Sequence, residues 1–144
     1  MNQLAIITAF VGGVKNRYMT YQEERSLAEK LALAAQVPGC GGVEACYPAD
    51  FENPALLKDL LAKYGLGVAA VNFRSRRSGK WWRGSFTSMA AGERQEVVDD
   101  LRRAMDLAVE LGCRRITTCP LNEGADNPFE VDYRRMYDYA LETF

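Results

Sequence analysis

Four short apolar runs alternate along the chain with four segments whose apolar residues recur at helical spacing. This alternation constrains the fold more than any other feature of the sequence. The apolar runs span residues 4–10, 42–47, 68–73 and 115–119. Because each intervening helix can serve as the crossover that joins two parallel strands, the order predicts an α/β fold with a parallel sheet. Strands that are largely apolar are typical of a sheet covered on both faces.

Capping residues mark the ends of the predicted helices. We expect Thr20 to cap the first helix, with Glu23 as its capping-box partner. Asn53 is a favoured N-cap for the second helix, with Pro54 in the first helical position. The third helix is expected from residue 90 or 93 to 111, and the fourth from 133 to 144. Their predicted apolar faces comprise Val97, Leu101, Ala104, Met105, Ala108 and Leu111, then Met136, Tyr137, Ala140 and Leu141.

Two architectures fit this order: an open doubly wound sheet, or part of a (β/α)8 barrel. Neither a G-x-G-x-x-G nor a P-loop motif is present. A complete barrel needs about 250 residues, so four units in 144 residues amount to half of one. We therefore expect residues 1–144 to form a single (βα)4 half-barrel that is incomplete at its C-terminus. The long loops follow strands, which predicts a functional site at the carboxyl ends of the strands.

Composition narrows the class of protein. The formal net charge is −1, and 48% of residues are apolar, which is typical of a soluble protein without a general affinity for nucleic acid. No segment has membrane-spanning length, and the N-terminus lacks a signal-peptide pattern, so a cytoplasmic location is expected. The chain has four cysteines, no C-x-x-C pair and no histidine, which argues against a zinc site. We expect Cys40, Cys46, Cys113 and Cys119 to be reduced and mostly buried.

A cationic and aromatic loop follows the third predicted strand, at residues 72–85. Its candidate substrate-binding residues are Asn72, Arg74, Trp81, Trp82 and Arg83. The tryptophans are candidates for a platform under a sugar ring, or for packing of the loop onto the barrel rim. The arginines are candidates for binding a phosphate or carboxylate, or for a solvated loop or subunit contact. Asn72 needs either a ligand or an internal partner.

Polar residues also lie in and beyond the other strands. Asn122 and Glu123 follow the fourth strand and are candidates for binding sugar hydroxyls, although turn and capping roles compete. Glu44 lies within the second strand, where a carboxylate must be paired or used for function, and we expect pairing with a lysine or arginine rather than a ligand role. No pair of carboxylates can be assigned to general acid–base catalysis, so the catalytic residues are unknown.

Several segments together resemble the sugar-phosphate isomerase/epimerase proteins with a xylose-isomerase-like barrel. The resemblance covers nearly the whole chain. It rests on residues 42–44 and 47–54, the third strand with Asn72, residues 80–88 and 108–113, the fourth strand with Pro120, and residues 129–135. The loops at 74–85 and 117–124 are also similar to the barrel subunits of C-glycoside deglycosidases.

The resemblance implies a metal-dependent enzyme that moves a proton next to a sugar carbonyl. The family holds Mn, Mg, Zn or Co through two glutamates, an aspartate and a histidine on later strands, so no metal ligand is assigned here. This half would supply substrate walls, and its expected partners are a sugar or glycoside and a copy or partner subunit that completes the barrel. Neither nucleic acid nor membrane is expected as a partner. The alternatives are an inactive half-barrel that serves as an interaction module, and an abasic-site endonuclease, which the neutral charge and absent histidines disfavour.

Overall fold

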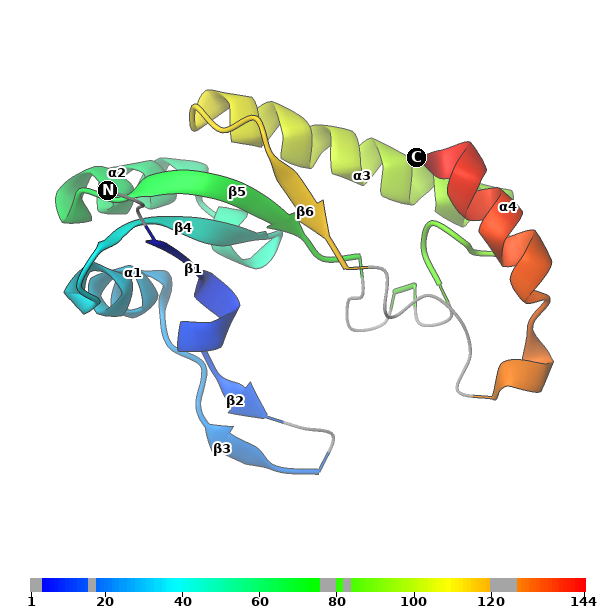
Figure 1. Cartoon of the computed structure of the whole chain (residues 1–144), viewed down its shortest axis with the longest axis horizontal. Coiled ribbons are helices and arrows are strands. Elements are labelled where there is room, and N and C mark those ends of the chain that lie inside the picture. Colours follow the sequence, from blue (N-terminus) through cyan, green and yellow to red (C-terminus); the bar gives the residue numbers. More distant parts are fainter. Residues whose placement is uncertain (1–3, 16–17, 76–79, 82–83, 120–126) are drawn as a thin grey trace. The chain divides into compact units, whose positions relative to one another are not determined.

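The computed structural model describes residues 4–15, 18–75, 80–81, 84–119 and 127–144 (Figure 1). The chain divides into two compact units. The first comprises Met1–Asn72 and Ala104–Thr117, and the second comprises Phe73–Arg103 and Thr118–Phe144. The first unit contains most of the sheet, and each unit is described by itself.

Four parallel strands form the main sheet, in the order β1-β4-β5-β6. The bounds of these strands are Leu4–Ile7 (β1), Cys40–Tyr47 (β4), Gly67–Phe73 (β5) and Ile116–Thr118 (β6). Strand β1 pairs with β4 so that Ile7 lies opposite Glu44. A helix lies in the chain between each pair of neighbouring strands, which confirms the predicted α/β half of a (β/α)8 barrel.

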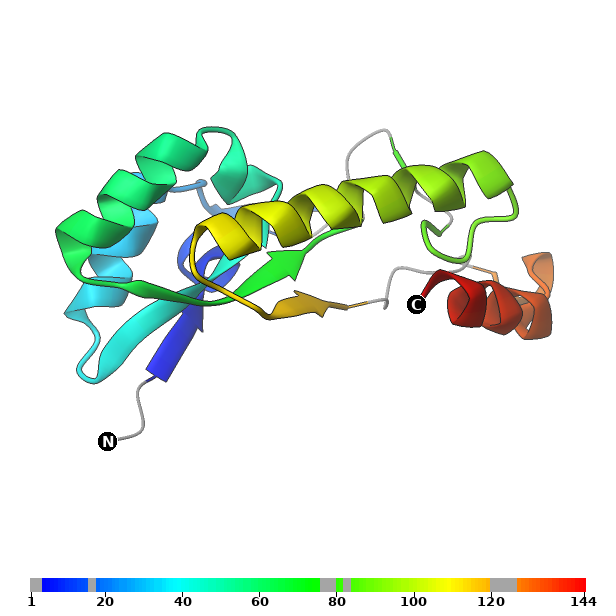
Figure 2. The same ribbon diagram turned by 90° about the horizontal axis from the view of Figure 1, so that it is seen from above.

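The four helices are α1 (Leu27–Gln36), α2 (Pro54–Tyr64), α3 (Ala91–Glu110) and α4 (Tyr133–Thr143). Helices α1 and α2 lie on the same side of β4 and β5 (Figure 2). Leu31 and Leu57 are fully buried, as are Val43 and Ala45 of β4. Because side chains alternate across a strand, Glu44 lies on the opposite face of β4 from Val43 and Ala45.

Close contact between β4 and β5 requires a glycine. A Cβ atom built on Gly42 would lie 2.9 Å from the carbonyl oxygen of Gly67, which is a backbone atom that cannot rotate away. The absence of a side chain at position 42 therefore lets the two strands approach closely at this point.

Several predicted helix ends are confirmed. The Asn53 side chain accepts a hydrogen bond from Leu56 N, Pro54 is the first residue of α2, and Gly65 ends that helix in the left-handed region with φ of 65°. Gly112 follows α3 with φ of 71°. The side-chain oxygen of Asn and the open conformational range of Gly are what these positions require.

The predicted start of the first helix is wrong. Thr20 belongs to strand β3 (Thr20–Gln22), which pairs antiparallel with β2 (Val14–Lys15) where we expected a loop. The capping box is formed by Ser26 and Glu29 instead. Both positions match the same capping pattern, and Thr20 lies in the paired hairpin, so the helix begins after it.

The first strand is also shorter than predicted. It ends at Ile7, and Thr8–Val11 forms a 3-10 helix, η1. The Thr8 side chain is buried and turns toward Asp50 of the 3-10 helix η2 (Ala49–Phe51). Three residues predicted on apolar helix faces, Met105, Tyr137 and Leu141, are exposed.

The second unit has its own aromatic core. Phe73 and Phe86 are buried with their ring centroids 5.9 Å apart, and Phe144 lies 4.7 Å from Phe86. Thr143 Oγ1 donates to the carbonyl of Phe86 at 3.2 Å. These contacts attach α4 to the segment that precedes α3. A further short helix, η4, spans Pro128–Glu130.

The thiols of all four cysteines are free, as predicted, and Cys46 and Cys113 are the buried ones. Cys119 is exposed and Cys40 is half-buried. In the described ranges, no helix combines the length and hydrophobicity that a membrane span requires.

Candidate functional site

Three polar side chains from three neighbouring strands meet on one face of the sheet. They are Glu44 of β4, Asn72 of β5 and Thr117 of β6, and we call them the polar ring. Each is half-buried, whereas Val43 and Val71, beside Glu44 and Asn72 in sequence, are fully buried. The alternation of side chains along β4 and β5 therefore brings Glu44 and Asn72 to the face opposite α1 and α2.

Hydrogen bonds close the ring. Asn72 Nδ2 donates to Glu44 Oε1 at 2.6 Å and to Thr117 Oγ1 at 3.0 Å. Thr117 Oγ1 in turn donates to Glu44 Oε1. A carboxylate has only acceptor atoms, so the nitrogen of the Asn72 amide, not its oxygen, must face Glu44.

The ring corrects one prediction about Glu44. Among the described residues, its partners are the Asn72 amide and the Thr117 hydroxyl, not the lysine or arginine that we expected. Two neutral donors on one oxygen stabilise a half-buried carboxylate without a nearby cation. The ring also supplies the internal partners for Asn72 that the sequence left open.

A second polar cluster lies deeper in the first unit, around Asp50. Asp50 is 2% exposed and accepts hydrogen bonds from Cys46 N at 2.7 Å and from Thr8 Oγ1 at 2.5 Å. Lys30 Nζ lies 3.7 Å from the other Asp50 oxygen, Oδ1. We call Thr8, Lys30 and Asp50 the Asp50 cluster.

Glu24 connects this cluster to the hairpin. Its Oε1 lies 2.6 Å from Lys30 Nζ, and its Oε2 accepts from Gly13 N at 2.9 Å. Burial alone would lower the pKa of Lys30. The hydrogen bond to Glu24 and the negative charges of Asp50 and Glu24 outweigh burial and raise the pKa of Lys30 above its ordinary value. Lys30 is therefore held in its charged form.

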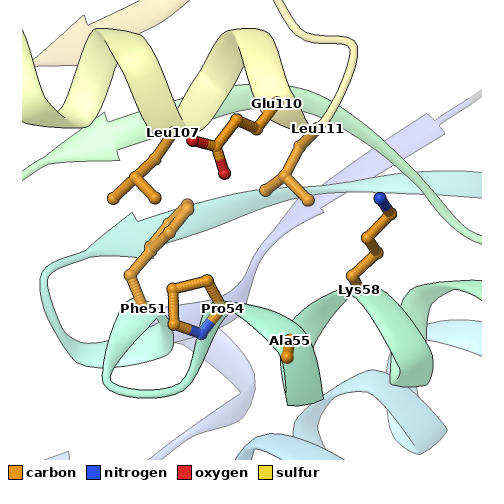
Figure 3. Close-up of a pocket in the computed structure, with 7 residues that line it drawn as sticks. All are labelled: Phe51, Pro54, Ala55, Lys58, Leu107, Glu110 and Leu111. Carbon is orange, nitrogen blue, oxygen red and sulfur yellow. The ribbon is translucent and has the colours of Figure 1, made fainter.

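An apolar pocket of about 220 Å³ lies on the helical side of the first unit, between α2 and the end of α3 (Figure 3). Phe51, Pro54 and Leu107 form part of its lining, and Lys58 and Glu110 supply its charged groups. Ligand pockets for drug-sized molecules are usually about 300–1,000 Å³. Its size and apolar lining fit a packing groove between helices better than a sugar site.

The residues predicted from the cationic loop belong to the second unit, except for Asn72. Arg74 is exposed. Trp81 is buried, with the Lys80 ammonium 4.5 Å from its ring centroid and 2.7 Å from Glu96 Oε1. The other predicted site residues, Trp82, Arg83, Asn122 and Glu123, lie outside the described residues. The structure thus unites one predicted residue, Asn72, with Glu44 and Thr117.

Little in the sequence points to the Asp50 cluster. Lys30 reads as an ordinary helix lysine, and Asp50 as part of the turn after Pro48.

The described residues do not fit a metal site. Within residues 4–15, 18–75, 80–81, 84–119 and 127–144, no group of three or more His, Cys, Asp or Glu side chains could hold an ion. The polar ring offers one carboxylate. We therefore assign no metal-dependent step to these residues.

Comparison with known proteins gives one family and one fold. A family model described as a xylose isomerase-like TIM barrel matches residues 31–142. The matching solved structures include an AP endonuclease, family 2, from Brucella melitensis, with a TM-score of 0.64 and 21% identity. That match covers 99% of this chain and 48% of the other, so this chain spans about half its length. A search of curated proteins found no match.

Proposed function

The chain belongs to the xylose isomerase-like TIM barrel family, and on this premise we propose that it is the N-terminal half of a carbohydrate-active enzyme. The complete barrel would move a proton next to a sugar carbonyl, as in an isomerase or epimerase, or cleave a C-glycoside. The superfamily includes sugar isomerases, epimerases and AP endonucleases. This half would supply substrate-binding walls, and the rest of the barrel would supply the catalytic groups.

The polar ring is the observation that carries this proposal. A sugar is recognised through many hydroxyl groups, which need polar partners held in fixed positions. Glu44 and Asn72 are fixed by their hydrogen bonds to each other and to Thr117 on three adjacent strands. Rigid strands hold such groups more accurately than loops do.

The other residues predicted from the sequence, Arg74, Trp81, Trp82, Arg83, Asn122 and Glu123, stay proposed substrate-binding residues. A divalent ion, Mn, Mg, Zn or Co, is expected in the complete barrel with ligands outside this chain. Such an ion polarises sugar oxygens when it is bound.

Proton exchange tests this function directly. The complete protein that contains this chain is incubated in deuterated water with a panel of aldoses and ketoses, after chelation and after each metal is restored. We expect deuterium to enter the carbon next to the carbonyl only with metal present, as read by NMR or mass spectrometry. Absence of exchange with every sugar and every metal would contradict the proposal.

The span of the match favours a second candidate, an interaction module that needs another chain. This chain covers 48% of the structure that it resembles, and β1 and β6 are the outer strands of its sheet. Exposed strand edges favour pairing with another chain. Sedimentation of the chain would then give about twice its 16.1 kDa. A monomer that unfolds cooperatively would exclude this pairing.

The printed name of the structural match raises a third candidate, an abasic-site endonuclease. At 21% identity the match shows the fold alone, and the net charge of −1 offers no general attraction for DNA phosphates. Incubation with duplex DNA containing one abasic site tests this activity. Metal-dependent cleavage at that site would favour the endonuclease over the sugar enzyme.

A further inference from the structure

We propose that the apolar pocket between α2 and α3 is a contact surface between two copies of this chain, with Lys58 of each copy beside Glu110 of the other. The pocket is the one of about 220 Å³ shown in Figure 3. All of its lining residues belong to the first unit, and none belongs to the polar ring or to the cationic loop. The inference therefore does not depend on the proposed sugar chemistry.

The place of the pocket in the fold leaves it accessible to a partner. The helices of a (β/α)8 barrel form its outer ring, and the active site lies at the carboxyl ends of the strands. A pocket between two of these helices therefore stays on the outer surface when further strands complete the barrel. It is also separate from β1 and β6, the outer strands of the sheet.

The lining of the pocket exposes apolar groups to water. Phe51 is buried, Leu107 and Leu111 are half-buried, and Pro54 and Ala55 are exposed. Removal of apolar surface from water contributes about 25 cal/mol per Å². A partner that covers this surface therefore gains free energy from burial.

Two exposed side chains of opposite charge border the apolar surface. Lys58 belongs to α2, and Glu110 is the last residue of α3. Neither forms an ion pair within the part of the chain that the structure describes. Glu110 also lies at the negative end of the α3 dipole, where a carboxylate is unfavourable and a cation is favoured. A positive charge from another molecule would therefore stabilise Glu110.

The two opposite charges favour a second copy as the occupant. Across a two-fold axis, a residue i that contacts residue j of the other copy is matched by j contacting i. One cation and one anion beside the pocket then give two Lys58–Glu110 pairs between the copies. A partner with charges of a single sign would match only one of these side chains. The formal net charge of −1 leaves little general repulsion between two copies.

The test measures dimerisation of the complete protein by sedimentation velocity over a concentration series. Lys58→Glu and Glu110→Lys each replace both ion pairs by like-charged contacts, so either variant alone should dimerise about 30-fold more weakly. Lys63→Glu is the matched control, because it makes the same change of charge on α2 outside the pocket. Its dissociation constant should stay within about twofold of the wild type. Equal dimerisation of all three variants would overturn the inference.

An equal mixture of Lys58→Glu and Glu110→Lys tests the arrangement itself. In a mixed dimer the two introduced charges face each other with opposite signs, and the native Lys58 faces the native Glu110. We therefore expect the mixture to regain the dimer that each variant lacks alone. Recovery only when both substitutions are in one chain would mean that the two charges act within a copy, and it would overturn the inference.

Ala55→Asp separates loss of the contact from loss of the fold. An aspartate in the first turn of α2 favours that helix, but at position 55 it also places a charge in the apolar pocket. We expect the monomer to unfold at an equal or higher temperature and the dimer to be about 10-fold weaker. Unchanged dimerisation of Ala55→Asp, or a wild type that stays monomeric at about 1 mM, would overturn the inference.

Discussion

Glu44 and Asp50 are two carboxylates of one compact unit, six positions apart in the sequence. They differ in how many of their oxygen atoms have hydrogen-bond or ionic partners. Asp50 is 2% exposed, and both of its oxygens face partners, with Thr8 and Cys46 on one and Lys30 on the other. Glu44 is half-buried and receives both of its hydrogen bonds on one oxygen.

The difference separates a structural carboxylate from a candidate for binding. A buried acid whose acceptors are all satisfied stabilises the fold and has nothing left for a ligand. An acid held firmly through one oxygen keeps the other in a fixed place for a substrate. The exposed fraction and the number of oxygens with partners therefore distinguish these two residues, although both side chains are carboxylates.

The largest expected effect is the loss of stability in Asp50→Ala. This substitution removes the acceptor of the buried Cys46 N–H and the Thr8 hydroxyl, and it leaves Lys30 with Glu24 alone. We expect the free energy of unfolding to fall by about 3 kcal/mol in urea denaturation. Glu44→Ala should reduce it by only about 1 kcal/mol. Equal losses would erase the distinction between the two acids.

Lys30→Met should lower the free energy of unfolding by about 1–2 kcal/mol, because it leaves Asp50 buried without its cation. The pKa of Lys30 is raised in the folded protein, so its contribution is complete below the unfolded pKa and is lost as pH rises through the folded pKa. The stability gap between wild type and variant should therefore close above the ordinary value of 10.5. A gap that stays constant up to pH 11.5 would contradict this assignment.

Thr117→Val and Thr118→Val compare a threonine inside the polar ring with its neighbour in β6. Thr117→Val should cost about 1 kcal/mol of stability, since it removes a hydroxyl that both accepts and donates. Thr118→Val should be neutral or slightly stabilising, because it removes a buried hydroxyl without a partner among the described residues. Thermal unfolding of the two variants side by side measures the difference. A larger loss of stability in Thr118→Val than in Thr117→Val would contradict the hydrogen bonds assigned to the polar ring.

Glu44→Gln should cost about 0.5 kcal/mol of stability, less than Asp50→Ala or Thr117→Val. One acceptor oxygen is enough for Asn72 and Thr117, so the ring can persist. A loss of stability as large as that of Asp50→Ala would show that the second Glu44 oxygen has a structural role.

Local patterns predicted most of the strands and helices. Asn53, Pro54 and Gly65 define α2 because each satisfies a backbone requirement that depends only on its neighbours. Thr20 failed as a cap because Thr20–Gln22 pairs with Val14–Lys15, and such pairing depends on residues elsewhere in the chain. Pairing between these two strands therefore determined the local structure, although Thr20 fits the sequence pattern of a helix cap.

The candidate site was predictable in part. A polar Asn72 and an acidic Glu44 inside apolar strands indicated that each needs a partner. That the partners are each other and Thr117 follows from the register of three strands, which a sequence pattern does not state. The Asp50 cluster joins three separate segments, through Thr8, Lys30 and Asp50, and no local spacing connects them.

The two oxygens of Glu24 make the backbone amide of Gly13 a remote reporter on Lys30. One oxygen accepts from Gly13 and the other meets the Lys30 ammonium, so one carboxylate links these two groups. Loss of charge at Lys30 would weaken the hold on Glu24 and let that amide open to solvent more often. Hydrogen exchange at one glycine on the hairpin would then record whether an ion pair inside the helical layer is intact.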